Sequence, residues 1–175
     1  GFLSELCRRW ESVAGPAAQA GLRTVQSRTG LVVSSSGGLG RILGAAYRVG
    51  AGARLGRGDQ WQPWIGLEDA AAGLLWAIEH DDVHGPVNLT APEPARNRDL
   101  HRLLSRAGGP PSVAVVPQLL LDRAGRAGAA GGTGSIGGML AELLGASQRA
   151  VPQALLASGF RFTAPDAASI WALGA

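Results

Sequence analysis

Two glycine-rich segments are the first candidates for chemistry, because closely spaced glycines let a backbone approach a phosphate group at the start of a helix. Gly132–Gly137 matches the dinucleotide pattern G-x-G-x-x-G, but small residues rather than a buried strand precede it. Ser36–Gly40 follows a predicted strand and opens a predicted helix, but Leu43 stands where the third glycine belongs. We interpret the first as a flexible loop. The second is a strand-to-helix loop of the kind that often borders a ligand site.

Ionisable side chains give three further candidates. His80 and His84 have the spacing of two metal ligands on a helix, but His80 ends a predicted helix, where the helix dipole alone accounts for an imidazole. We therefore predict no metal site. Glu68 and Asp69 suit an acid/base pair, but two acids in the first turn of a helix are also what capping and the dipole favour. Cys7 has apolar neighbours on a helix face, which predicts a buried structural thiol.

Two of the five tryptophans, Trp61 and Trp64, lie in a segment of short strand and loop. A tryptophan side chain in such a segment is buried in a core less regularly than one on a helix. An indole ring gives a ligand site an apolar wall and an N–H donor. We predict that both rings border a ligand.

The composition excludes several classes of function. All 16 basic residues are arginines, which rules out Schiff-base chemistry, a Walker-type lysine and a Tyr-x-x-x-Lys pair within this chain. The arginines are dispersed and the net charge is only +3, so nucleic-acid binding is not favoured. The single cysteine favours a reducing, cytoplasmic compartment, and the absence of a long apolar run predicts no membrane span.

The chain has 175 residues, 46% of them hydrophobic, and begins with Gly, which we interpret as one domain or a fragment of a larger protein. Strands alternate with helices, which is typical of an α/β fold with a parallel sheet. Asn97 is the expected N-cap of its helix, and the strand at 113–117 is expected to be buried. We expect the apolar residues Leu74, Leu75, Ala77 and Ile78 to fill the body of the helix at 67–80. Helices are predicted at 2–14, 39–49, 67–80, 97–108, 117–125, 139–148, 151–160 and 165–173, and strands at 22–35, 85–91 and 113–117.

Short runs in a fixed order across nearly the whole chain carry a resemblance to a known family. The runs are LCRRWE (6–11), RTGLVV (28–33), GG (37–38), LGRGDQW (55–61), WI (64–65), GPVNLTAPEP (85–94), SQRAVP (147–152) and SGFRF (158–162), followed by Pro165. By their order and spacing the chain resembles the later part of the sugar-nucleotide epimerase family of bacteria and organelles. These are atypical short-chain dehydrogenases/reductases that end in a domain of unknown function.

The resemblance implies a Rossmann-like parallel sheet whose N-terminal cofactor half, with a G-x-x-G-x-x-G loop, is absent from this chain and is its missing partner. Residues 1–94 would be the second half of the Rossmann-like domain. Residues 95–175 would be a small, mostly helical substrate-side domain, with a glycine-rich insertion at about 124–138. The implied cofactor is NADP or NAD, bound mainly by the absent half, and the implied substrate is a nucleotide sugar or a similar small molecule.

The resemblance also assigns residues to the site. Arg28, Thr29 and Gly30 would lie near the nicotinamide end of the cofactor. A second set would surround a small substrate: Gly38, Gln60, Trp61 and Trp64.

The chain departs from the family where catalysis is concerned. Leu3 and Cys7 occupy the positions of the Tyr-x-x-x-Lys dyad, and the only tyrosine, Tyr47, lies on another predicted helix. Further family positions are changed as well: Leu31 replaces an Asn, Gln62 an Arg and Gly66 a His. The catalytic residues therefore stay unknown.

Three hypotheses follow. The first is an NAD(P)-binding, epimerase-like oxidoreductase. The second is a non-catalytic nucleotide-binding or interaction protein that keeps the fold without the dyad. The third is a piece without independent activity, which leaves an unpaired strand edge.

Overall fold

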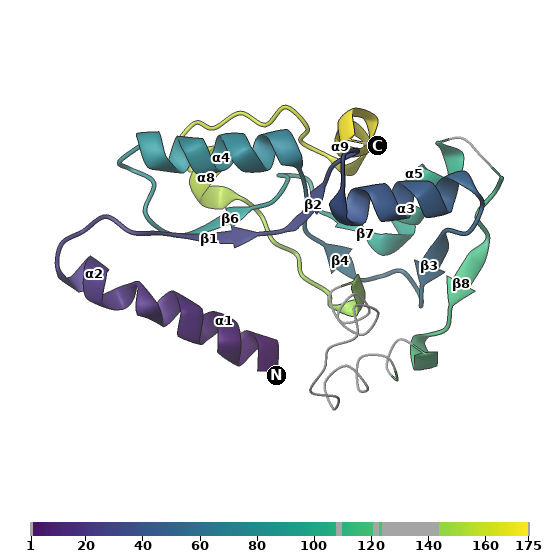
Figure 1. The fold of residues 1–175 in the computed structure, drawn as a ribbon, viewed down its shortest axis with the longest axis horizontal. Helices are drawn as coiled ribbons and strands as arrows, with labels where there is room; N and C mark the ends of the chain where they lie inside the picture. Colours follow the sequence, from purple (N-terminus) through teal and green to yellow (C-terminus); the bar gives the residue numbers. More distant parts are fainter. Residues whose placement is uncertain (1, 108–109, 121–122, 124–143, 175) are drawn as a thin grey trace.

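The computed structural model describes residues 2–107, 110–120, 123 and 144–174. Its strands form pairs (Figure 1). Three pairs are parallel: β1 (Val25–Thr29) with β6 (Gly85–Leu89), β2 (Leu31–Val33) with β5 (Trp64–Gly66), and β3 (Ala53–Leu55) with β8 (Ala114–Val116). The fourth, β4 (Trp61–Gln62) with β7 (Ala95–Arg96), is antiparallel. Parallel pairs alternating with helices confirm the predicted α/β class.

Helices cover both sides of the β1–β6 pair. Figure 1 shows α4 on one side of this pair and α1 with α2 on the other. Within the described residues β1 pairs only with β6, so its other edge carries no strand. The helices of the described residues are α1 (Phe2–Val13), α2 (Gly15–Gln19), α3 (Gly38–Arg48), α4 (Leu67–Glu79), α5 (Asn97–Arg106), α8 (Gln153–Ala157) and α9 (Ala167–Gly174).

Helix α4 packs on the sheet through small residues. Ala70, Gly73 and Ala77 are buried, and a Cβ on Gly73 would lie 2.9 Å from Leu89 Cδ2. Small side chains let the helix approach the strands closely, which leaves the larger ones outside. Of the apolar residues in the body of this helix, Ala77 is buried, whereas Leu74, Leu75 and Ile78 are exposed.

The core is divided between two hydrophobic clusters. The first, beneath α4, joins β5 and β6 to α8, with Ile65, Leu89 and Leu155 almost fully buried. The second joins β2, β5 and α5 to the C-terminal helix α9, whose Trp171 ring meets the Trp64 ring edge-on at a centroid distance of 6.0 Å. The C-terminal helix is thus part of the core.

Two local expectations are wrong. Helix α5 begins at Asn97, but the buried Asn97 side chain does not cap it; its Oδ1 accepts the Leu55 backbone N–H at 2.9 Å and ties α5 to β3. Strand β8 is not buried, because its only partner among the described residues is β3. Val115 in β8 is 45% exposed.

The contact between the buried Tyr47 and the half-buried His101 makes stability depend on pH. Tyr47 Oη lies 2.8 Å from His101 Nδ1. Burial, and then the charge of Arg54, lower the pKa of His101, while burial raises the pKa of Tyr47 to about 12. The unfolded chain therefore binds a proton at His101 before the folded chain does, so stability is lost as the pH falls below about 6.5. It is also lost above about pH 10, where Tyr47 ionises first in the unfolded chain.

We expect urea unfolding midpoints to decrease on both sides of the neutral range. His101→Gln should reduce the decrease of the midpoint at acidic pH, because glutamine does not titrate. The decrease at alkaline pH should stay the same. If the midpoint at acidic pH decreases equally in this variant, other groups cause the pH dependence.

Candidate functional site

A cleft of about 880 Å³ lies between α1 and β1, runs along β1 from Val25 to Gly30, and reaches the carboxyl end of β6 at Asn88 and Thr90. Gly30 follows β1 directly, and Thr90 follows β6 directly, so the two positions are neighbours at one edge of a parallel pair. Asn88, Pro63 and Gln148 complete this wall. Open α/β sheets bind ligands at the carboxyl ends of their strands, so the end of the cleft at Gly30 and Thr90 is in the expected place for a ligand.

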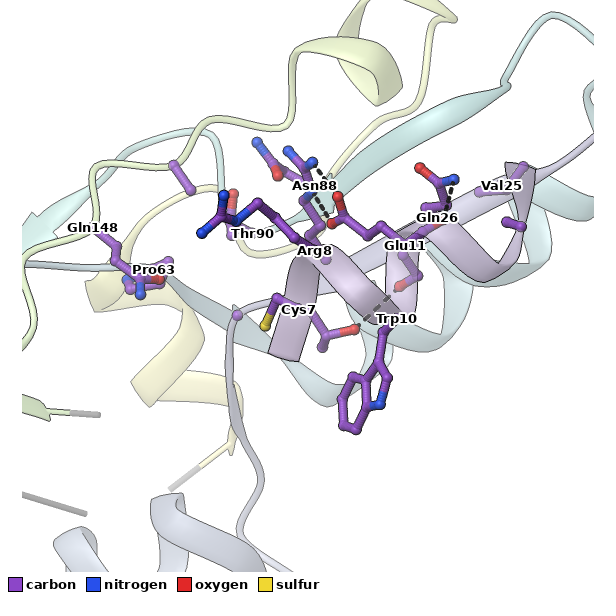
Figure 2. Close-up of a pocket in the computed structure, with 16 residues that line it drawn as sticks. Cys7, Arg8, Trp10, Glu11, Val25, Gln26, Pro63, Asn88, Thr90 and Gln148 are labelled. Atoms are coloured by element: carbon purple, nitrogen blue, oxygen red, sulfur yellow. Dashed lines mark hydrogen bonds and ion pairs between the residues drawn. The ribbon is translucent and has the colours of Figure 1, made fainter. Parts of the chain in front are cut away.

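Helix α1 forms the opposite wall. Figure 2 shows Arg8 and Glu11 on the side of α1 that faces Asn88 and Thr90, whereas the Trp10 ring points away from them. Cys7 is exposed and also lines the cleft, so the prediction of a buried structural thiol is wrong.

The three predicted cofactor residues, Arg28, Thr29 and Gly30, all line this cleft. A bidentate ion pair fixes the first of them: Arg28 Nε and Nη2 donate to the two Glu11 carboxylate oxygens at 2.6 and 2.7 Å. The hydrogen bond from Arg28 is the main reason that the pKa of Glu11 is lowered. This pair links α1 to β1 across the cleft.

Gly30 lies where three segments of the chain meet. Its N–H donates to Leu89 O at 2.9 Å, and the next residue, Leu31, donates to Pro63 O at 2.6 Å. A Cβ on Gly30 would lie 2.2 Å from Pro63 O and 3.1 Å from Thr90 Cγ2. The position therefore has no room for a side chain.

The predicted substrate residues do not line the cleft. Gly38 begins α3 with φ at +64°, and Gln60 Nε2 donates to Leu55 O at 3.2 Å. Trp64 is only 3% exposed and belongs to the core. Trp61 is half-buried and lies beside two guanidinium groups. Among these four predicted residues, Trp61 is the one whose side chain is partly accessible and lies beside charged groups.

Two arginines near Trp61 were missed in the sequence. Arg96 Cζ lies 4.5 Å from the centre of the Trp61 ring, and Arg149 Cζ lies 5.5 Å from it. Arg96 is brought there by the β4–β7 register, which pairs it with Trp61. The run SQRAVP contains Arg149, but nothing in the sequence places that run beside Trp61.

The other candidate groups have structural roles where they are described. His80 stacks on Trp76 at a ring distance of 3.5 Å, and no three metal-binding side chains gather among the described residues. Asp69 is buried and accepts the N–H groups of Thr163 and Ala164, so it neither caps α4 nor forms an acid/base pair with the exposed Glu68. The motif at 132–137 lies outside the described residues. No helix in the described part is long and apolar enough to cross a membrane.

Parallel strands separated by helices, with a cleft at their carboxyl ends, define a Rossmann-like class of protein. Residues 135–170 match the family described as a domain of unknown function (DUF1731). An epimerase family protein of Mycobacterium bovis is 40% identical over 162 residues, which cover 93% of this chain and 50% of that protein. One of Bacillus subtilis is 33% identical over 165 residues, covering 94% and 50%.

Two solved structures agree with this assignment. A nucleoside-diphosphate sugar epimerase from Corynebacterium glutamicum is 30% identical with a TM-score of 0.71, over 99% of this chain and 31% of that one. A human epimerase family protein solved with NADPH is 27% identical with a TM-score of 0.67, over 86% and 47%. This chain belongs to the epimerase family of short-chain dehydrogenase/reductase-like proteins and corresponds to their C-terminal part. It spans about half the length of the curated relatives it matches.

Proposed function

We propose that this chain is the substrate-side part of a cytoplasmic, epimerase-like oxidoreductase that binds NADP or NAD and acts on a nucleotide sugar. The cleft carries the proposal, because Arg28, Thr29 and Gly30 line it together at the carboxyl ends of two parallel strands. The human relative solved with NADPH and the Corynebacterium sugar epimerase support the cofactor and the substrate class. Most of the cofactor would be held by a region outside this chain.

The residues that line the cleft fit a nicotinamide ring. Gly30 lets Pro63 and Thr90 pack closely at the end of the cleft, and the Glu11 carboxylate holds Arg28 in place. The buried Thr90 Oγ1 has no hydrogen-bond partner among the described residues, so the wall keeps an unused polar group. When bound, the nicotinamide would supply the acceptor and donor of a hydride. The residues of this chain would position the ring and the substrate and exclude water from them.

A second candidate function rests on the position of Cys7. This thiol lies on the cleft wall where the family carries the lysine of its dyad, and no described residue of the wall is a tyrosine or a lysine. A protein that binds the nucleotide without converting a substrate is the alternative that this wall favours.

The complete reading frame that contains this chain provides the test. We expect NADPH fluorescence to change saturably on titration with that polypeptide, and its absence would reject the proposed function. A panel of nucleotide sugars then separates the two candidates. Conversion of any of them supports the oxidoreductase, whereas NADPH binding without conversion supports the non-catalytic protein.

Alkylation of Cys7 offers a second test that needs no activity. Because Cys7 is exposed on the wall of the cleft, iodoacetamide should label it in the free protein, and saturating NADPH should slow the labelling several-fold. Peptide mass spectrometry measures the labelling rate at this residue. Cys7→Ala should remove the signal and keep NADPH binding. A labelling rate that NADPH does not change would place the cofactor away from this wall.

A further inference from the structure

The side chains of Trp61, Arg96 and Arg149, which we call the Trp61 patch, bring two positive charges to one aromatic ring. Both guanidinium carbons lie over the Trp61 ring, at 4.5 and 5.5 Å from its centre. The two carbons are therefore separated by at most about 10 Å, which is comparable to the Debye length of about 10 Å at 0.1 M salt, so like charges at this distance repel at low ionic strength. Cation–π contact with a partly accessible ring contributes only about 0.5–1 kcal/mol for each arginine. A bound anion would relieve the repulsion.

Backbone contacts fix the patch in place. The Trp61 N–H donates to Ser147 Oγ at 3.2 Å, and the Gln148 N–H donates to Trp61 O at 2.9 Å. These bonds hold the residues before Arg149 against β4. On the other side, the β4–β7 register fixes Arg96 opposite Trp61. The two arginines therefore come from separate elements that are tied to the same strand.

Positive charge exceeds negative charge around the patch. One carboxylate, Asp59, is shared by three guanidiniums: Arg57 at 3.3 Å, Arg96 at 3.8 Å, and Arg98 at hydrogen-bonding distance. The exposed Arg149 has no ion pair with any described residue. Four arginines thus lie near two acids, because Arg98 also reaches Asp99 at 4.0 Å. The charge of Arg149 is not compensated by a carboxylate in the described part of the chain.

We propose that the Trp61 patch binds the diphosphate of the nucleotide-sugar substrate, with Arg149 and Arg96 as its ligands; this deepens the proposed function and rests on it. Guanidinium groups bind phosphate oxygens through charge-assisted hydrogen bonds. Arg149 has no ion pair with a described residue, whereas Arg96 is shared with Asp59 through a long ion pair of 3.8 Å. Two neighbouring arginines suit one compact polyphosphate. The indole of Trp61 restricts their motion, so less entropy is lost when the anion binds.

Calorimetric titration of the complete polypeptide tests the site with three probes: UDP-glucose, inorganic pyrophosphate and NADPH. Arg149→Gln should weaken UDP-glucose and pyrophosphate binding about tenfold and leave NADPH binding unchanged, since one charge-assisted contact is lost. Arg149→Lys, which keeps the charge, should recover part of the affinity. Arg102→Gln is the matched control, because Arg102 is exposed and pairs only with Asp99 on its own helix. Equal unfolding midpoints will show that the variants are folded.

The titration with pyrophosphate separates this inference from the proposed function. If Arg149→Gln and the unaltered protein bind pyrophosphate and UDP-glucose equally, the inference is overturned while the cofactor proposal stands. If Arg149→Gln weakens NADPH as much as UDP-glucose, the patch serves the cofactor and the inference is again overturned. If the unaltered protein binds pyrophosphate through Arg149 but binds no NADPH, the anion site stands and the proposed function falls.

Discussion

Replacing Gly30 with alanine is expected to lower the free energy of unfolding by about 3 kcal/mol, a large fraction of the stability of an ordinary domain. The added Cβ would lie 2.2 Å from the carbonyl oxygen of Pro63 and 3.1 Å from the methyl group of Thr90. The nearest atom belongs to the backbone, so no side-chain rotation relieves the overlap. The strand segments have to move apart.

That movement breaks hydrogen bonds which join separate strands. Pro63 O accepts the N–H of Leu31, and Leu89 O accepts the N–H of Gly30. Both bonds lie next to the new methyl group. The same shift widens one wall of the cleft, so NADPH binding should weaken together with stability.

Urea unfolding of Gly30→Ala against the unaltered chain measures the effect. Gly15→Ala is the matched control, because a Cβ on Gly15 meets nothing within 4 Å and alanine favours the helix α2. Its unfolding midpoint should stay the same or increase slightly. An unfolding midpoint of Gly30→Ala close to that of the control would show that the three segments can separate without cost.

Local patterns predicted the elements, because local physical chemistry decides them. The acids of the first turn and the apolar body of α4 indicate a helix whatever it packs against, and the bounds of the structure agree to within one residue. Sequence alone did not reveal which face of α4 is buried. The small residues Gly73 and Ala77 face the sheet because β6 approaches closely, and that approach is a property of the tertiary fold.

The predicted single strand at 22–35 shows the same limit. The structure divides it at Gly30, because β1 pairs with β6 whereas β2 pairs with β5. Two partner strands meet at the residue where a strand changes its partner. The sequence shows a glycine at this position but does not reveal the change. The partner of each half depends on segments more than thirty residues away.

The predicted site residues come together in the structure only where they are adjacent in the chain. Arg28, Thr29 and Gly30 are consecutive, and all three line the cleft. The predicted substrate set was scattered over separate turns and strands, and the structure leaves Trp64 in the core. The contact of Trp61 with Arg149 joins positions far apart in the sequence, and no spacing rule predicts it.

Asp69 gives the clearest example of a residue whose role depends on a distant segment. Its two carboxylate oxygens accept the N–H groups of Thr163 and Ala164 at 2.9 and 2.8 Å. These amides lie within the segment that matches DUF1731. The two acids of the first turn of α4 are alike in sequence, but one is exposed and the other joins the sheet domain to the C-terminal segment.

Asp69→Ala is therefore expected to destabilise the protein by about 3–5 kcal/mol, because it leaves two backbone donors without their charged acceptor. Asp69→Asn should cost less, since its amide oxygen still accepts one of the two bonds. Glu68→Ala is the control, with an expected change below about 1 kcal/mol from the helix dipole alone. Hydrogen exchange locates the effect: the amides of Thr163 and Ala164 should lose protection in Asp69→Ala before those of β6 do. If all three variants unfold at the same urea concentration, Asp69 does not hold the C-terminal segment on α4.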